Sequence, residues 1–98
     1  MYKILIVEDD ETIAGGLKNH LEKWNYQAEC MTDFKDVMGK FVEFEPQLVL
    51  LDIVLPFFNG FHWCQEIRKI SKVPIIFLSS VNDNMNIVMA MNMGGDEF

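Results

Sequence analysis

The chain has 98 residues, of which 50% are hydrophobic and 23% are charged. This length allows one domain, and this composition supports a hydrophobic core and argues against disorder. The formal net charge of -7 argues against direct binding of a nucleic-acid backbone. Because no apolar run approaches the ~18 residues of a membrane span and no signal peptide stands at the N-terminus, we expect a soluble, cytoplasmic protein. Cys30 and Cys64 are expected as free thiols in a reducing compartment.

The first strand and helix are predicted at the N-terminus. Residues 3–7 are a short β-branched apolar run, typical of a buried strand, and four acids follow over 8–11. A helix is expected over 11–24, because acids at the start of a helix interact favourably with the helix dipole in the first turn. Its buried face should carry four apolar side chains, Ile13, Leu17, Leu21 and Trp24. Gly15 and Gly16 are a defect in this helix, for which close packing is the one reason we find.

A second strand and helix follow. Residues 26–31 alternate apolar and polar side chains, which predicts a strand at the edge of the sheet. Thr32 or Asp33 can cap a helix that ends at Glu45 and Pro46. The side chains expected to point inward from this segment are Phe34, Val37, Met38, Phe41 and Phe44.

The central apolar run, residues 48–51, leads straight into Asp52. Such a run, followed by the turn signals Pro56, Asn59 and Gly60, predicts a strand buried on both faces. A helix is then expected over 60–70, an apolar strand over 73–78, and a methionine-rich helix over 83–93.

The alternation of four strands with four helices predicts an α/β fold with a parallel sheet, right-handed crossovers and helices on both faces. In a doubly wound, flavodoxin-like sheet of order 2-1-3-4, the first, third and fourth strands are neighbours. Their carboxyl ends then open at the switch point, where ligands bind in such folds.

Polar side chains end these three strands: Glu8 and Asp9 the first, Asp52 the third, and Ser79 the fourth. Three crowded carboxylates repel one another unless a hard divalent cation lies between them. Mg²⁺ fits, because it takes few carboxylates and bridges phosphate. With Mg²⁺ bound, Asp52 can attack phosphorus while Ser79 hydrogen-bonds a phosphoryl oxygen. The sequence therefore predicts phosphoryl transfer onto an aspartate.

Four motifs resemble, in order and spacing, those of response-regulator receiver domains of the OmpR/PhoB-type subfamily. They are residues 4–10, residues 50–56 with Gly60, residues 73–80 and residues 94–98. The resemblance covers residues 1–98 as a single receiver domain. It implies a two-component signalling switch, which catalyses no reaction beyond its own phosphorylation and dephosphorylation.

The resemblance also implies roles for individual residues. Asp52 is the phospho-acceptor, Asp9 binds Mg²⁺ directly, Glu8 acts largely through water, and the backbone carbonyl of Val54 completes the metal site. The implied switch residues are the Ser79 hydroxyl and the Phe98 ring, with Ser80 as the small residue beside the phosphate. The implied partners are a sensor histidine kinase and, in the parent protein, a C-terminal winged-helix DNA-binding domain that regulates transcription.

The sequence departs from the family pattern at its end. Phe98 is the last residue, whereas the family has a lysine and a proline three residues after the switch aromatic, followed by a fifth strand and a fifth helix. We therefore expect an incomplete receiver domain from a longer protein, phosphorylated more slowly than the complete domain. The uncovered edge of the fourth strand is expected to allow a homodimer or strand exchange.

Other functions fit the sequence less well. An aspartyl-phosphate phosphatase of the haloacid-dehalogenase type needs a second carboxylate where this chain has Val54. A receiver that binds partners without phosphate is favoured by the missing lysine and opposed by the intact acids and Ser79. A metal site formed by His62, Cys64 and Glu66 is disfavoured, since alternate residues of a helix do not share a face. The methionines of 83–93 are core residues or a partner surface.

Overall fold

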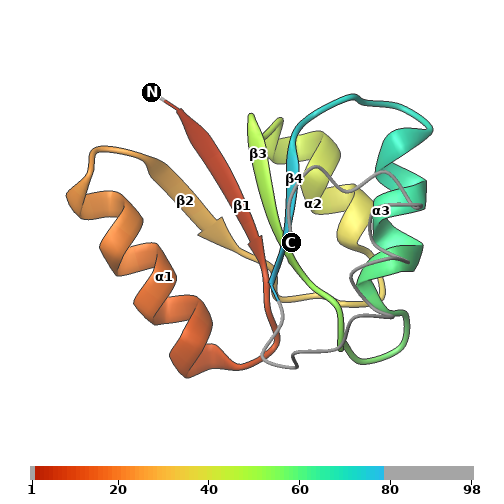
Figure 1. Ribbon diagram of the computed structural model, residues 1–98, viewed down its shortest axis with the longest axis horizontal. Coiled ribbons are helices and arrows are strands. Elements are labelled where there is room, and N and C mark those ends of the chain that lie inside the picture. The colour runs from red at the N-terminus through yellow and green to blue at the C-terminus, as the bar shows by residue number, and fades with distance from the viewer. Residues whose placement is uncertain (1, 79–98) are drawn as a thin grey trace.

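A four-stranded parallel sheet forms the centre of the computed structural model, which describes residues 2–78 (Figure 1). Every neighbouring pair in the order β2-β1-β3-β4 is parallel. The strands are β1 (Lys3–Val7), β2 (Gln27–Cys30), β3 (Leu48–Asp52) and β4 (Ile75–Leu78). This arrangement confirms the predicted flavodoxin-like α/β fold, with β2 at an edge.

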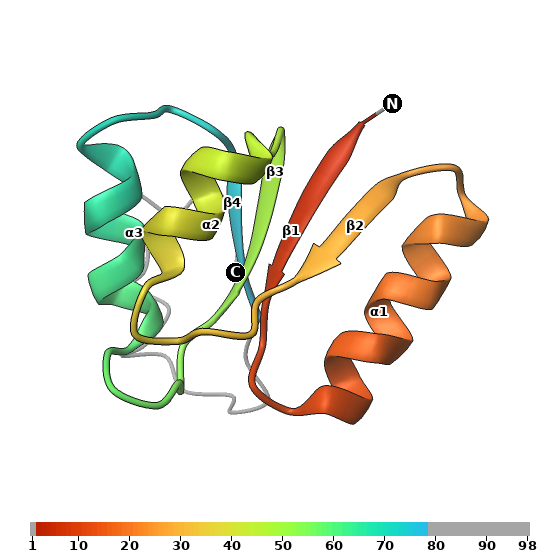
Figure 2. The same cartoon turned by 180° about the vertical axis from the view of Figure 1, so that it is seen from behind.

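Helices cover both faces of the sheet. Helix α1 (Glu11–Lys23) lies against one face, and α2 (Val37–Phe44) and α3 (Gly60–Arg68) lie against the other (Figures 1 and 2). The connections β1–α1, β2–α2 and β3–α3 all leave the sheet at the same end, where the three strands finish (Figure 1). This end carries the residues predicted to be functional.

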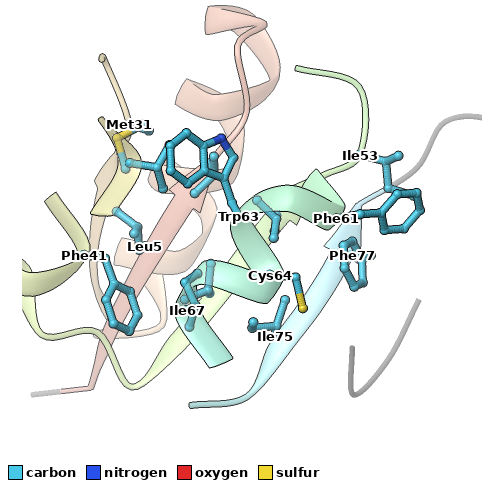
Figure 3. Close-up of a cluster of buried hydrophobic side chains, with 14 of the residues drawn as sticks. Leu5, Met31, Phe41, Ile53, Phe61, Trp63, Cys64, Ile67, Ile75 and Phe77 are labelled. Atoms are coloured by element: carbon cyan, nitrogen blue, oxygen red, sulfur yellow. The ribbon is translucent and has the colours of Figure 1, made fainter. Parts of the chain in front are cut away.

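The larger hydrophobic cluster lies between the sheet, α2 and α3 (Figure 3). Phe61 of α3 packs on Phe77 of β4, with ring centroids 5.6 Å apart. In β3, Val49 and Leu51 belong to this cluster, whereas Leu50 faces the smaller cluster under α1. All three are buried, which confirms that β3 is covered on both faces.

Capping side chains start two helices at the functional end of the sheet. Asp10 Oδ1 accepts hydrogen bonds from the backbone N–H groups of Thr12 and Ile13, at 2.9 and 3.2 Å. Asn59 Oδ1 likewise accepts from His62 N at 2.9 Å. Each bond satisfies a donor that the first helical turn leaves without a partner. The acids after β1 therefore have different roles. Asp10 caps α1, whereas Glu8 and Asp9 do not.

The predicted cap of the second helix was wrong. Asp36 is the N-cap of α2 and accepts from Gly39 N at 3.0 Å. Asp33 instead accepts from Lys35 N, and its carbonyl accepts from Asp36 N, so it belongs to a separate turn before the helix. Several residues of capping type follow one another here, and each can bond to the local backbone. Phe34 consequently packs against the core from a loop.

The predicted buried face of α1 was wrong in part. Leu17 and Leu21 pack against the smaller cluster, but Ile13 is 49% and Trp24 is 68% exposed. Ala14 takes the central buried position, and the thiol of Cys30 in β2 donates to its carbonyl at 3.6 Å. Ile13, next to Ala14 in the helix, therefore points away from the buried position, and Trp24 lies at the C-cap, after the last residue of α1.

Close packing does not explain Gly15 and Gly16. A Cβ atom built on either residue would have no neighbour within 4 Å. The sequence therefore carries two helix-weakening residues where alanine would fit.

The remaining differences concern boundaries. Residues 26 and 31 lie outside β2, residues 69 and 70 outside α3, and residues 73 and 74 outside β4. Ser79, Ser80, the helix predicted over 83–93 and Phe98 lie outside the described residues. None of the helices described in residues 2–78 has the length and apolar character needed to cross a membrane.

Replacing Gly15 or Gly16 by alanine should raise the free energy of unfolding by about 0.5 to 1 kcal/mol each. The alanine methyl group meets no other atom, and the unfolded chain loses conformational freedom. Thermal unfolding followed by circular dichroism measures the gain, about 4 to 8 °C per kcal/mol for a domain of this size.

Gly39→Ala is the matched control within a helix. A Cβ at Gly39 would collide with the Asp36 carboxylate that caps α2, so this substitution should give a smaller gain or a loss. Destabilisation by Gly15→Ala or Gly16→Ala would show that these glycines have a structural role.

Candidate functional site

The pairing of β1 with β3 brings the predicted acidic residues together. In the parallel register Val7 lies beside Leu51, so that Glu8 and Asp9 follow β1 at the level where Asp52 ends β3. Parallel strands end at the same edge of a sheet, and here that edge also carries the β3–α3 loop (Figure 1).

The carboxylates of Glu8, Asp9 and Asp52 form one cluster. One oxygen from each group can be chosen so that all three lie within 4.8 Å of one another. Glu8 is 8% exposed and Asp52 is half-buried, whereas Asp9 is exposed to solvent. The structure thus brings together the three acids that the sequence predicted to share a pocket.

Backbone N–H groups orient the two less exposed carboxylates. Asp52 Oδ1 accepts from Ile53 N at 2.8 Å, and Glu8 Oε2 accepts from Asp10 N at 3.2 Å. Both donors belong to loops that follow the strands. The turn of the chain out of each strand therefore holds the carboxylate that ends it.

The cluster has no positive counter-charge within residues 2–78. The ion pairs of lysine in this part of the chain go to Glu29, Glu43 and Glu66 instead. Burial is the main cause that raises the pKa of Glu8 to about 7, and its hydrogen bond with Asp52 and the charge of Asp52 add to this. Burial also raises the pKa of Asp52, and the charge of Asp9 adds to it.

These residues fit a hard divalent cation. Carboxylate oxygens are the donors that Mg²⁺ prefers, and an exposed third acid leaves room for the waters that this ion retains. A bound cation would also favour the ionised forms that burial and repulsion disfavour. The alternative metal site of His62, Cys64 and Glu66 is not formed. Cys64 is buried in the core, and Glu66 pairs with Lys69 at 2.7 Å.

Gly60 is a positioning residue whose role the sequence did not reveal. A Cβ atom there would overlap the carbonyl oxygen of Asp52 and lie 3.0 Å from the Cα of Ile53. Gly60 N also donates to Ile53 O at 2.9 Å, which closes the loop between β3 and α3. The glycine was identified as a turn signal, but its contact with the backbone of Asp52 depends on a tertiary approach that local sequence does not encode.

The other predicted site residues are less constrained. The backbone N–H of Val54 is among the groups that lower the pKa of Asp52 against the larger effect of burial, and the Val54 side chain is 69% exposed. Metal binding by its carbonyl stays a prediction. Ser79 and Phe98, the predicted switch pair, lie outside the described residues.

The model of the response regulator receiver domain family matches residues 4–98. The chain belongs to this family. The receiver domain is 52% identical over 98 residues to the uncharacterized transcriptional regulatory protein YvcP of Bacillus subtilis, and 45% identical over 96 residues to the response regulator protein GraR of Staphylococcus aureus. It spans 41% and 43% of the lengths of these relatives.

Solved structures agree with this assignment. The N-terminal domain of the nisin resistance regulator NsrR is 52% identical to this receiver domain, with a TM-score of 0.90. The alignment covers 100% of this chain and 83% of that one. The BeF3-activated receiver domain of Klebsiella pneumoniae RstA is 29% identical, with a TM-score of 0.93 over 97% of this chain and 81% of that one.

Gly60→Ala should destabilise the receiver domain by about 1 to 3 kcal/mol, because the new methyl group meets backbone atoms that cannot rotate away. It should also weaken Mg²⁺ binding by displacing the end of β3. Urea denaturation and calorimetric titration with Mg²⁺ measure the two effects. Gly16→Ala, the same change at an open position, should neither destabilise the domain nor weaken Mg²⁺ binding. Equal behaviour of the two variants would contradict the close contact between Gly60 and the Asp52 carbonyl.

Without metal, Glu8→Gln should become increasingly more stable than the wild type as the pH rises from about 4.5 to about 7. The folded protein holds the Glu8 proton up to about pH 7, whereas the unfolded chain releases it near 4.5. Stability is therefore lost as the pH rises through this window. The difference in free energy of unfolding should grow by about 1 to 3 kcal/mol, measured by urea denaturation in EDTA. A difference that stays constant with pH would contradict the raised pKa.

Proposed function

We propose that Asp52 accepts a phosphoryl group and that this receiver domain works as a phosphorylation switch. The observation that carries the proposal is the meeting of Glu8, Asp9 and Asp52 within 4.8 Å at the carboxyl edge of the sheet. Asp52 stands at the end of the central strand, and its carboxylate is oriented by a loop that Gly60 holds close. A nucleophile for phosphoryl transfer needs this fixed position beside a metal site.

The proposed donor is a phosphohistidine on a sensor kinase. A carboxylate oxygen of Asp52 forms a new bond to phosphorus while the phosphorus–nitrogen bond of the phosphohistidine breaks. The bonding electron pair stays on the histidine nitrogen, which then takes a proton from water. The product is an aspartyl phosphate, and its hydrolysis by water returns the carboxylate and inorganic phosphate.

In the proposal, Asp9, Asp52 and the Val54 carbonyl would hold Mg²⁺ directly and Glu8 would hold it largely through water, and the bound ion would supply positive charge for the phosphoryl oxygens. Glu8 and Asp9 keep that charge beside the nucleophile. In the proposal Ser79 donates a hydrogen bond to the phosphoryl group, and the ring of Phe98 changes position in response.

The proposal extends to partners in the cell. The relatives YvcP and GraR are named as a transcriptional regulatory protein and a response regulator protein. Both are more than twice as long as this chain, which spans 41% and 43% of their lengths. We infer that the receiver domain controls a C-terminal winged-helix domain that binds DNA, in a cytoplasmic protein. The domain catalyses no reaction beyond its own phosphorylation and dephosphorylation. Self-association through the edge of β4 stays a prediction, since residues 79–98 lie outside the described part.

Incubation with acetyl phosphate and Mg²⁺ should add one phosphoryl group to the wild-type protein, seen by intact-mass spectrometry and removed by hydroxylamine. The acyl phosphate of an aspartate reacts with hydroxylamine, whereas a phosphate ester of serine does not. Asp52→Asn should lose the label, and Asp9→Ala should reduce its rate by about tenfold or more because one ligand of the metal is lost.

Asp10→Asn is the matched control, since Asn is an equally good helix cap and Asp10 serves α1 rather than the cluster. It should be labelled like the wild type. Labelling that survives Asp52→Asn, or that does not depend on Mg²⁺, would refute the proposed function.

A further inference from the structure

Asn59 is followed by Gly60, and it is the one asparagine in the sequence with a glycine directly after it. In such a pair the backbone nitrogen of the glycine can attack the amide carbon of the asparagine side chain, because no glycine side chain blocks the approach. The pair joins the β3–α3 loop to α3 (Figure 1). Asn59 is exposed, whereas Gly60 is buried. The reactive pair therefore crosses the boundary between solvent and core.

The reaction open to this pair is deamidation, and its only co-reactant is water. The Gly60 nitrogen loses its proton and forms a bond to Cγ of Asn59. The bond between Cγ and the side-chain nitrogen breaks, and this nitrogen takes a proton from water and leaves as ammonia. Water then opens the resulting succinimide ring at either carbonyl. The products are aspartate in the normal backbone, or isoaspartate, in which the backbone runs through Cβ and Cγ of the former side chain.

Two hydrogen bonds oppose ring closure in the folded protein. Gly60 N donates to Ile53 O at 2.9 Å, so the proton that must be lost first is held inside a closed loop. Asn59 Oδ1 accepts from His62 N at 2.9 Å, which holds the side-chain amide over the first turn of α3. Both bonds belong to the junction between β3 and α3, and deamidation requires that this junction opens.

The backbone of Asn59 also has the wrong conformation for the ring. Its ψ angle is 172°, so the chain is extended at this residue. In the succinimide the Gly60 nitrogen lies nearly in the plane of Cα, Cβ and Cγ, which an extended ψ does not allow. Rotation about ψ would move Gly60 away from Ile53 and would separate α3 from its cap. The pair can therefore react only when the first turn of α3 leaves its native position.

We propose that Asn59–Gly60 is a covalent modification site, a deamidation site that the fold keeps closed. Each opening of the first turn of α3 exposes it to base-catalysed attack. Because the reaction releases ammonia, the change persists after the turn closes again. This chemistry needs neither Mg²⁺ nor phosphorylation of Asp52, so it is tested separately from the proposed function.

The two products should have opposite effects on the fold. Aspartate keeps an oxygen for His62 N, is an equally good helix cap, and adds a negative charge that the helix dipole favours at this end. Isoaspartate adds one carbon to the backbone directly before Gly60. Gly60 already lies so close to β3 that a Cβ atom would overlap the carbonyl oxygen of Asp52. The inserted carbon therefore breaks either this close fit or the hydrogen bond to Ile53.

The rates of deamidation in the native and the urea-unfolded chain test the proposal. Both samples are incubated in the same mildly alkaline buffer with EDTA, and peptide mapping by mass spectrometry follows each asparagine. We expect Asn59 to react about a hundredfold or more slowly in the native chain. Asn25 is the internal control, because it is also exposed but is followed by the bulky Tyr26, and it should react slowly in both samples.

Asn59→Ser keeps a capping side chain and has no amide to lose, so it should show no modification at this position. A native rate for Asn59 close to the unfolded rate would overturn the proposal. An unfolded chain in which Asn59 is no more reactive than Asn25 would also overturn it.

Hydrogen exchange at the Gly60 amide identifies the opening. Exchange and deamidation both begin with loss of the same proton from Gly60 N, so the fold should slow both reactions by the same factor. Exchange is measured by NMR on the nitrogen-labelled native chain in the same buffer. Fast exchange at Gly60 beside slow deamidation of Asn59 would overturn the protective role of the hydrogen bond to Ile53.

Refolding separates the two products. The chain modified in urea is returned to native buffer and divided by size-exclusion chromatography, and the peptides of the compact and the expanded fractions are compared. Aspartate should be enriched in the compact fraction, and Asn59→Asp, made directly, should be at least as resistant to urea as the wild type. Isoaspartate should be enriched in the expanded fraction. Equal amounts of isoaspartate in both fractions would overturn the conclusion that the close fit of Gly60 against β3 excludes it.

Discussion

Repulsion among three carboxylates is the constraint on which the functional end of this domain depends. The parallel register of β1 and β3 places Glu8 and Asp9 beside Asp52, and nothing within residues 2–78 forms an ion pair with them. Burial makes the conflict stronger, since it raises the pKa values of Glu8 and Asp52. The packed strands beneath must hold the groups together against this repulsion. A positive charge bound among the three carboxylates would relieve this repulsion.

The face of the sheet under α2 and α3 contributes most directly to holding the carboxylates in place. The larger cluster joins β1, β3 and β4 to α2 and α3, and it includes Ile53 and Phe61 on either side of the β3–α3 loop. Gly60 connects this core to the site, because its backbone lies against the Asp52 carbonyl and bonds to Ile53. A shift of α3 relative to the sheet would thus move the end of β3 directly. The position of Asp52 therefore depends on the packing of α3.

Much of the fold and of the acidic cluster could be predicted from the sequence, because apolar runs that end in acids specify both a buried strand and the place where it ends. The order of the strands and the meeting of Glu8, Asp9 and Asp52 follow from that pattern. The cap at Asp36, the exposure of Ile13 and the role of Gly60 do not follow. Each depends on a choice between locally equivalent residues, or on an approach between distant parts of the backbone. Ser79 and Phe98 belong to the expectation drawn from family resemblance and lie outside the described residues.

The β3–α3 loop shows how tertiary contacts can oppose local conformational preferences. Local preferences disfavour a phenylalanine at positive φ with two thirds of its surface exposed, yet Phe57 is held there by its turn and by Lys35. The carboxylates at the strand ends are general to phosphoryl chemistry, and their geometry leaves little freedom for variation. The hydrogen bond between Gly60 and Ile53 closes the loop beside them, and the residues between these two are exposed except Leu55, which packs against the core. The acidic cluster thus depends on the ends of the strands, and the exposed residues of the loop can change without disturbing those ends.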